Sequence, residues 1–140
     1  MKRTALAQWN GNLKEGKGSI TTQSATLSKT QYSFGTRFAD GVGTNPEELL
    51  GAAHAGCFTM ALSATLEQAG FVAGNLETKA TVEFNPSTLK ITTITLELSA
   101  AAIPGVNEDQ FKAYATAAKE NCPVSKALAG VSITLTVNYK

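Results

Sequence analysis

Two cysteines, Cys57 and Cys122, are the residues of this 140-residue chain best suited to covalent chemistry. A thiol is a nucleophile only as the thiolate, and an ordinary cysteine is mostly protonated at neutral pH. Cys57 lies in a stretch with a helical pattern, and Cys122 directly precedes Pro123, which suits the first position of a helix. Unpaired N–H groups at that helix start would lower the pKa of the Cys122 thiol. The alternative is a pair of buried, inert cysteines, which are common in protein cores.

A thiolate at Cys57 needs a cation, and Arg37 is the best candidate. A guanidinium is charged at every working pH and has several N–H donors, so it can hydrogen-bond a sulfur and a second acceptor together. Because most arginines are exposed, an ordinary surface position is the alternative for Arg37.

His54, the only histidine, precedes Cys57 by three residues, which places both side chains on one face of a helix. That spacing brings the stems together but rarely gives a sulfur-to-nitrogen hydrogen bond. We therefore interpret His54 as a core residue and not as the base of a Cys–His pair. A zinc site needs three or four ligands at suitable spacing, and two distant cysteines with one histidine make a weak case for one. We expect no metal and no bound cofactor.

Length and charge narrow the remaining function classes. A chain of 140 residues fits one domain, residues 1–140. A formal net charge of +1 gives no basic surface for nucleic acid or an anionic membrane. The first thirty residues contain no signal-peptide pattern, and polar residues interrupt the longest apolar stretch, Leu49–Leu66. We expect a cytoplasmic protein without a membrane span, where thiols stay reduced and two cysteines are more often redox-active or buried than a structural disulfide.

The segments before Cys57 predict a hairpin, a further extended segment and a long helix. Weak alternation over residues 5–9 and 18–22, with a turn near Gly11, predicts the hairpin. A third extended segment is expected over residues 32–38.

The long helix has a clear predicted start. Asn45 suits the cap, Pro46 the first helical position, and Glu48 follows the cap by the three residues of a capping box. Gly70 marks the end. Because apolar residues cover most of its surface, we expect this helix to be buried on several sides.

The second half of the chain predicts strands and helices of one α+β domain. Residues 76–84 and 89–98, rich in Thr, Val and Ile, predict a hairpin with an irregularity at Thr92-Thr93. Alternation over residues 131–139 predicts a last strand. The inward residues of the second hairpin strand are Ile91, Ile94, Leu96 and Leu98. Those of the last strand are Val131, Ile133, Leu135, Val137 and Tyr139.

Two helices are expected between these strands. Gln110 follows Asn107 by the three residues of a capping box, which predicts that the first helix begins after Asn107. Pro123 ends this helix. Pro123 can also start a short helix over residues 124–129. The inward stripe of the first of these helices is Phe111, Tyr114, Ala115 and Ala118.

Four motifs carry a resemblance to a known family: YSFGTRF at residues 32–38, GTNPEEL at 43–49, AAHAGCF at 52–58 and ENCPVS at 120–125. In these motifs the chain closely resembles the OsmC/Ohr family of thiol peroxidases (osmotically inducible protein C and organic hydroperoxide resistance protein). The NPEEL and AAHA segments are more similar to the OsmC branch. The resemblance implies an α+β OsmC-like fold, with antiparallel strands wrapped around a central buried helix in an intertwined homodimer.

The resemblance also implies a mechanism and a role in oxidative or osmotic stress defence. The Cys57 thiolate would attack an organic hydroperoxide, become a sulfenic acid and condense with Cys122 to a disulfide. An external dithiol, either a lipoyl group on a partner protein or a small thiol, would restore both cysteines. Glu47, like its counterpart in the family, would orient Arg37.

Ten helical residues separate Glu47 from Cys57, a rise of about 15 Å and a rotation of about 80°. These two side chains cannot touch within one straight helix. Either the first turn bends away, or Arg37 and Glu47 reach Cys57 from a partner subunit. We expect a site shared across a dimer interface. The alternative for Glu47 is a favourable interaction of about 0.3–1 kcal/mol with the helix dipole. For Glu48 we prefer this interpretation.

Two other functions compete with the peroxidase. A non-enzymatic stress protein could hold a hydrophobic ligand, with the cysteines incidental. A general thiol–disulfide oxidoreductase is disfavoured, because the chain has no Cys-x-x-Cys motif. An apolar pocket would also select alkyl or aryl peroxides, although most aromatic residues of a small domain belong to its core. The candidates for its lining are Phe34, Phe38, Phe58, Met60, Phe111 and Tyr114.

Overall fold

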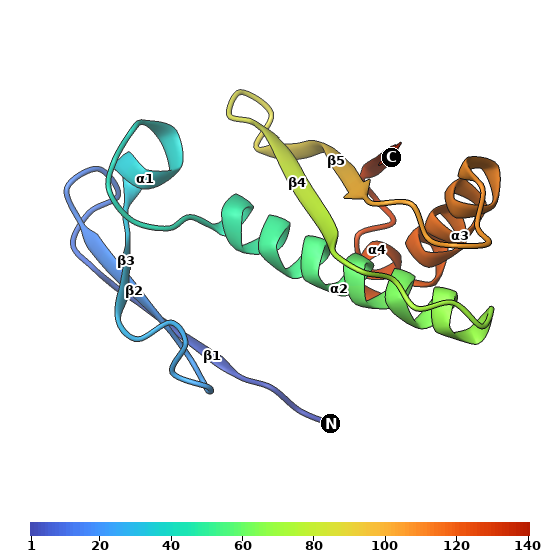
Figure 1. Ribbon diagram of the computed structural model, residues 1–140. Coiled ribbons are helices and arrows are strands. Elements are labelled where there is room, and N and C mark those ends of the chain that lie inside the picture. The colour runs from blue at the N-terminus through green and yellow to red at the C-terminus, as the bar shows by residue number, and fades with distance from the viewer. The chain divides into compact units, whose positions relative to one another are not determined.

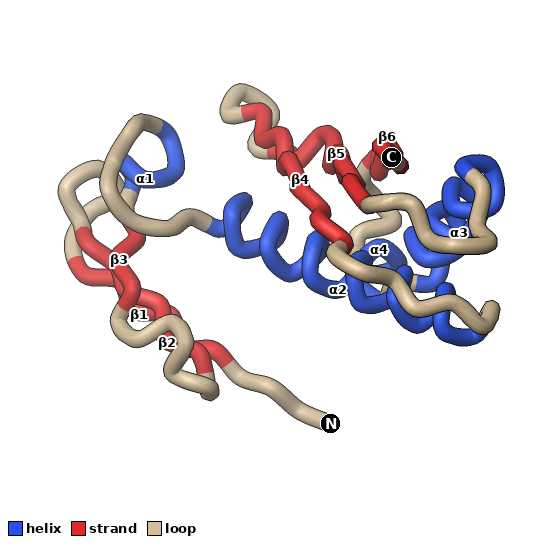
Figure 2. Tube along the Cα trace, viewed as in Figure 1, coloured by secondary structure: helices blue, strands red, loops and turns tan.

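The computed structural model describes all of residues 1–140 and divides them into two compact units, Met1–Leu49 and Leu50–Lys140. We describe each unit by itself (Figures 1 and 2). The elements are a mixture of helices and strands, which confirms the predicted α+β class. A single domain over residues 1–140 stays a prediction.

The first unit is built on a three-stranded antiparallel sheet. Its strands are β1 (Ala5–Asn10), β2 (Lys17–Thr22) and β3 (Thr30–Tyr32), in the order β1-β2-β3. The predicted hairpin is therefore confirmed. Gly18 lies opposite Trp9 and Tyr32 in the ladder, and any side chain at Gly18 would collide with both rings. This glycine allows two aromatic side chains to lie over the middle strand.

The extended segment expected over residues 32–38 is wrong beyond Tyr32. Ser33 instead caps the short helix α1 (Phe34–Phe38). The Ser33 hydroxyl accepts a hydrogen bond from the Thr36 backbone N–H at 3.2 Å, and the Thr36 hydroxyl accepts one from the Ser33 N–H at 2.8 Å. This reciprocal capping satisfies two backbone donors locally, which outweighs the strand propensity of the aromatic residues.

Helix α2 (Pro46–Gln68) begins where predicted, with the Asn45 side chain accepting a hydrogen bond from the Glu48 backbone N–H at 2.8 Å. The return half of the capping box is absent, because the Glu48 carboxylate accepts instead from the Thr44 hydroxyl at 3.4 Å. The expected burial on several sides is not found in the single chain. One stripe is buried, while Met60 is 75% exposed. The buried residues of α2 are Gly51, His54, Phe58, Leu62 and Leu66.

The second unit contains the strands β4 (Leu76–Asn85), β5 (Lys90–Ala100) and β6 (Ser132–Tyr139), in the order β4-β5-β6. The β4–β5 hairpin is antiparallel, with a register shift opposite Thr92 that matches the predicted irregularity. The β5–β6 pair is parallel, which corrects the expectation of antiparallel strands throughout. Parallel neighbours need a crossover connection, and here two helices supply it.

These crossover helices are α3 (Glu108–Asn121) and α4 (Pro123–Ala127). The capping box from Asn107 to Gln110 is complete, as predicted. Residues of α2 and α3 form a core with the inward side chains of the sheet, and the Phe111 and Tyr139 rings stack with their centroids 4.2 Å apart. The largest fully buried aliphatic and aromatic residues are Phe58, Leu62, Leu66, Ile94, Leu96, Leu98 and Phe111. This core fixes the face of α2 that carries His54.

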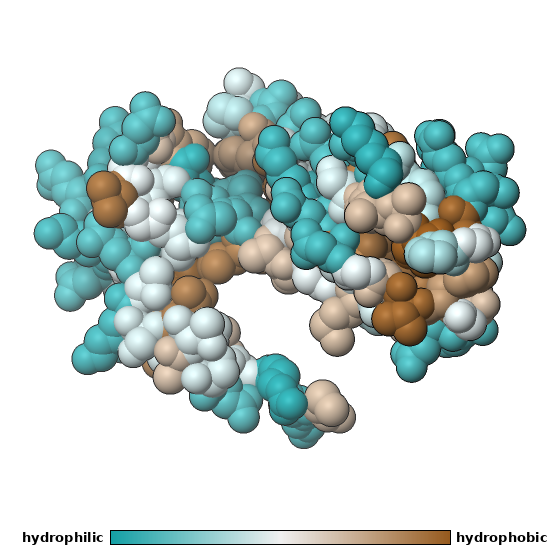
Figure 3. Space-filling view, in the orientation of Figure 1, coloured by the Kyte–Doolittle hydropathy of each residue, from teal (hydrophilic) through white to brown (hydrophobic).

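Two surface properties bear on function. Helix α2 is long and apolar enough to cross a bilayer by length and hydropathy alone. Its Gly51, Phe58 and Leu62 side, however, packs against the sheet of the second unit, so we interpret it as a helix of a folded domain. Hydrophilic residues cover much of the face seen in Figure 3, and apolar residues reach it at scattered points.

Candidate active site

Arg37 and Glu47, both in the first unit, form the ion pair that the sequence proposed. The Arg37 Nη2 atom lies 2.8 Å from Glu47 Oε1, and Nε lies 3.2 and 3.3 Å from the two carboxylate oxygens. The Glu47 side chain is 12% exposed and that of Arg37 is 37% exposed. Two donors of one guanidinium therefore hold one carboxylate, which fixes the orientation of the arginine.

Local structure sets this pair in place. Arg37 lies in the last turn of α1, and Glu47 lies in the first turn of α2. The Asn45 side-chain amide, which also caps α2, donates a hydrogen bond to the Thr36 carbonyl at 3.1 Å and so ties the end of α1 to the start of α2. The Arg37 guanidinium lies 5.5 Å from the centroid of the Phe38 ring, a cation–π distance.

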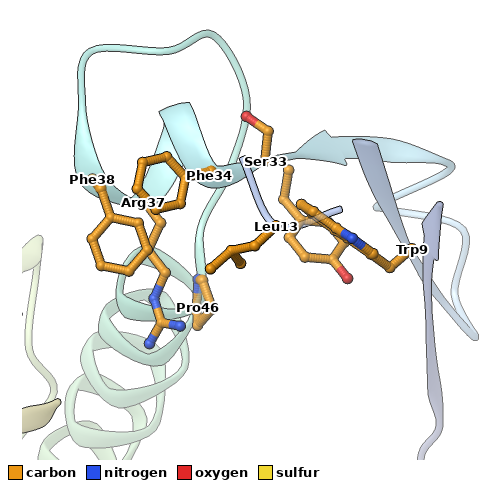
Figure 4. A pocket seen from close by; sticks show the side chains of 8 residues that line it. Trp9, Leu13, Ser33, Phe34, Arg37, Phe38 and Pro46 are labelled. Atoms are coloured by element: carbon orange, nitrogen blue, oxygen red, sulfur yellow. The ribbon is translucent and has the colours of Figure 1, made fainter. Parts of the chain in front are cut away.

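An apolar pocket of about 280 Å³ lies beside Arg37 in the first unit (Figure 4). The Arg37 side chain passes between Phe38 and Pro46 toward the start of α2 in this view. Of the six residues expected to line such a pocket, Phe34 and Phe38 do so, with ring centroids 4.6 Å apart. The full lining is Trp9, Leu13, Tyr32, Ser33, Phe34, Arg37, Phe38 and Pro46.

The other four candidates do not line this pocket. Phe58 and Phe111 are fully buried core residues, Tyr114 packs against the core, and Met60 is exposed in the single chain. Trp9 and Leu13 were not among the predicted lining residues; Trp9 lies in β1, and Leu13 lies in the turn that joins β1 to β2. Their contact with the motif around Arg37 depends on strand pairing, which no local spacing reveals.

Cys57 and Cys122, both in the second unit, lie side by side although 65 residues separate them. Their Sγ atoms are 2.8 Å apart, and both thiols are free. This is within about one ångström of a disulfide bond, which measures about 2.05 Å. Cys122 is fully buried, whereas Cys57 is partly exposed. Cys57 is thus the more accessible thiol of the pair, and Cys122 lies behind it in the core.

Cys122 is the N-cap of α4, as the sequence indicated. Its sulfur accepts a hydrogen bond from the Ser125 backbone N–H at 3.5 Å. Burial alone would raise the pKa of the Cys122 thiol, but hydrogen bonds from Cys57, from Ser125 and from the Val124 backbone outweigh it and lower that pKa.

Cys57 has the opposite balance. Burial and the hydrogen bond with Cys122 raise the pKa of the Cys57 thiol, and the Val124 backbone N–H offsets this only in part. Either thiol can donate the sulfur–sulfur hydrogen bond. We place the proton on Cys57, because the Ser125 N–H points to the Cys122 sulfur. The second unit by itself therefore favours the thiolate at Cys122. The two arginines of the chain, Arg3 and Arg37, both belong to the first unit.

His54 is fully buried, as expected of a core residue, and its Nε2 atom lies 2.8 Å from the Ser125 hydroxyl oxygen. Its Nδ1 atom has no hydrogen-bond partner. Burial lowers the pKa of His54, so the ring is neutral at pH 7. Ser125 was not among the predicted site residues, although it follows Cys122 by three residues, the spacing at which a cap contacts its helix.

Metal ligation has little support in the side chains. No group of three or more His, Cys, Asp and Glu side chains comes together in the structure. The expectation that no metal takes part stays a prediction.

Comparison with known proteins gives consistent matches. The model of the family described as OsmC-like protein matches residues 39–137. The chain is 44% identical to peroxiredoxin OsmC of Escherichia coli strain K12 over 136 residues, which cover 96% of this chain and 92% of that protein. It is 31% identical over 102 residues to an organic hydroperoxide resistance protein-like protein of Staphylococcus aureus strain USA300, covering 71% and 73% of the two chains.

Solved structures match along nearly the whole chain. An organic hydroperoxide resistance protein from Elizabethkingia anophelis superposes with a TM-score of 0.73 at 26% identity, covering all of this chain and 99% of that one. The organic hydroperoxide resistance protein OhrB of Bacillus subtilis gives a TM-score of 0.70 at 26% identity, with coverages of 96% and 98%.

Proposed function

Because the chain belongs to the family of OsmC-like proteins, we propose that it is a two-cysteine peroxidase that reduces organic hydroperoxides to alcohols in stress defence. The observation that carries the proposal is the pair of free thiols, Cys57 and Cys122, with sulfur atoms 2.8 Å apart. The names of the relatives support peroxidase chemistry. The two-cysteine sequence of steps is the one that the family resemblance implies, and the short distance between the two sulfurs supports it.

In the first step, the Cys57 thiolate attacks the distal peroxide oxygen. The O–O bond breaks, Cys57 becomes a sulfenic acid, and the alkoxide leaves as the alcohol after taking a proton. In the second step the Cys122 thiolate attacks the Cys57 sulfur, a disulfide forms, and the oxygen leaves as water. An external dithiol, a lipoyl group or a small thiol, then reduces the disulfide by exchange and is itself oxidised.

Arg37 supplies what the second unit lacks for the first step. Burial and the contact with Cys122 raise the pKa of Cys57, so the attacking anion needs a cation beside it. Arg37, held by Glu47, presents a preorganised cation at the edge of the apolar pocket. An organic hydroperoxide offers the two matching parts: an apolar group for the pocket, and an oxygen that a guanidinium can polarise.

We propose further that Arg37 and Glu47 act on Cys57 of a second copy in a homodimer. Helix α2 runs unbroken from Pro46 to Gln68, which gives no support to a bend between Glu47 and Cys57. The rise of about 15 Å between these two residues remains. The exposed Met60 side of α2 is an apolar surface that a partner would cover. A cytoplasmic setting, in which dithiols keep the cysteines reduced, completes the proposal; we expect no nucleic-acid or membrane partner.

Counting thiols tests the proposal. Reduced protein mixed with one equivalent of cumene hydroperoxide should lose both free thiols and gain a disulfide between Cys57 and Cys122, identified by peptide mapping. Cys57→Ser should abolish the reaction. Cys122→Ser should still consume about one equivalent, leaving a sulfenic acid that a dimedone probe traps. Unchanged thiols in the wild-type protein would instead favour a hydrophobic-ligand-binding protein, and an unreactive Cys57 in Cys122→Ser would refute the assigned roles.

A further inference from the structure

A second contact joins the same two helices that carry the cysteines. His54 precedes Cys57 by three residues on α2, and Ser125 follows Cys122 by three residues on α4. The His54 Nε2 to Ser125 Oγ distance is 2.8 Å, and so is the distance between the two sulfurs. One polar contact and one sulfur contact therefore link the same two faces, each one helical turn from the other.

The hydrogen bonds around Ser125 assign the His54 tautomer. Nδ1 is buried without a partner, and a buried N–H without an acceptor costs more than a bare nitrogen lone pair. The proton therefore belongs on Nε2, which donates to the Ser125 oxygen. The Ser125 hydroxyl proton is then free to point elsewhere. The neighbour it favours is Cys122: the Ser125 backbone N–H already lies 3.5 Å from that sulfur, and hydrogen bonding from the Ser125 side chain is one of the causes that lower the pKa of the Cys122 thiol.

We propose that His54 and Ser125 are positioning residues for the resolving cysteine: His54 orients Ser125, and Ser125 holds the Cys122 thiolate against the Cys57 sulfur. This inference rests on the proposed peroxidase function and assigns a role to the one histidine. His54 acts through Ser125 on Cys122 and does not serve as a base for Cys57.

The step that this pair assists is disulfide formation. The Cys122 thiolate donates an electron pair to the Cys57 sulfenic sulfur, the S–S bond forms, and the S–O bond breaks. Hydroxide leaves and takes up the proton that Cys122 lost, which gives water. Cys122 is oxidised and the sulfenic sulfur is reduced. The Ser125 hydroxyl stabilises the Cys122 anion before the attack, and it stabilises the same anion as leaving group when a dithiol opens the disulfide at Cys57.

The first arm of the test reads the Cys122 thiolate alone. In a Cys57→Ser background the thiolate absorbance near 240 nm is followed against pH with and without Ser125→Ala. In this background no second thiol titrates next to Cys122. The one titratable group linked to it is His54, which contacts it through Ser125. We expect Ser125→Ala to lower the thiolate fraction at pH 7 about fivefold to tenfold, the loss of one hydrogen bond to an anion. Ser125→Thr, which keeps the hydroxyl, should restore it.

The second arm separates the two chemical steps in otherwise wild-type protein. After one equivalent of cumene hydroperoxide, Ser125→Ala should form the sulfenic acid at the wild-type rate but the disulfide about tenfold more slowly, so dimedone trapping rises. His54→Leu should do the same, and His54→Gln, which can still donate from a side-chain N–H, should recover part of the rate.

The outcomes are distinct. Equal thiolate titrations and equal disulfide rates in Ser125→Ala and wild type would overturn the positioning role and leave the peroxidase intact. Wild-type protein that forms no disulfide would overturn the proposed function, while the thiolate titration would still report on the pair. Should His54→Leu fail to fold, as judged by circular dichroism, Ser125→Ala and Ser125→Thr decide the question. A rate loss that Ser125→Thr does not rescue would also count against the hydroxyl.

Discussion

Replacing Glu47 by Gln tests whether Glu47 orients a catalytic arginine or only favours the helix dipole. The substitution keeps the shape of the side chain but removes the charge that accepts from Arg37 Nε and Nη2. Hydrogen bonds to charged groups contribute about 1.5–3 kcal/mol. Because Arg37 is 37% exposed, we take the lower end, about 1.5 kcal/mol. Since about 1.4 kcal/mol is tenfold in rate, the oxidation of Cys57 should slow about tenfold.

Two variants bracket this effect. Arg37→Ala removes the cation itself and should slow Cys57 oxidation by about two to three orders of magnitude, as expected for one preorganised donor. Glu48→Gln is the matched control: it removes a charge from the same first turn, but the only hydrogen bond that the Glu48 carboxylate accepts is from Thr44. Its rate should stay within about twofold of wild type, because the helix-dipole effect of about 0.3–1 kcal/mol acts on the stability of the helix and not on the orientation of Arg37.

The assay is a stopped-flow single turnover of reduced protein with cumene hydroperoxide, quenched for thiol counting. Trp9, the only tryptophan, lines the pocket beside Arg37 and gives a second signal. Thermal unfolding of each variant checks that the fold survives. Equal rate losses in Glu47→Gln and Glu48→Gln would reduce Glu47 to a helix-terminus charge, and a wild-type rate in Arg37→Ala would make Arg37 an ordinary surface residue.

Three further predictions concern the shared site, the apolar pocket and the buried histidine. When Cys57→Ser and Arg37→Ala proteins are mixed under conditions of subunit exchange, a shared site predicts activity above that of either parent. A mixture that stays inactive after verified exchange, or a monomer in sedimentation, would rule out the shared site. Phe34→Ala should lower kcat/KM for cumene hydroperoxide about tenfold while sparing hydrogen peroxide, because it removes apolar contact from the pocket; equal losses for both peroxides would argue against substrate binding there. Burial lowers the pKa of His54 in the folded protein. As pH falls, the unfolded chain therefore protonates His54 before the folded protein does. The stability contributed by the neutral histidine is complete above pH about 6.5 and is lost as pH falls toward the lowered pKa of the folded state. The melting temperature of wild type should therefore fall more steeply between pH 7.5 and 5 than that of His54→Gln, and parallel curves would contradict a buried neutral histidine.

Local sequence signals determined the elements. The Asn45 cap with Pro46 located the start of α2, and the spacing from Asn107 to Gln110 located that of α3. Alternation fixed the inward face of β6. These signals work because caps, proline and side-chain alternation act over a few residues and need no distant partner. They misplaced β3, which ends at Tyr32 where the predicted extended segment begins, and α1, where the Ser33 to Thr36 capping box has the same spacing as the other two.

The candidate site residues were also predictable, as residue types in motifs, but their contacts were not. That Cys57 and Cys122 meet depends on a crossover that places α4 against α2, across 65 residues of chain. The parallel pairing of β5 with β6 and the single buried stripe of α2 depend on the same packing. So does the preference for the thiolate at Cys122, because a thiol pKa depends on burial and on hydrogen bonds from groups distant in sequence. Sequence determined which side chains are available for chemistry, and tertiary packing decided which of the two thiols has the lower pKa and which residue His54 contacts.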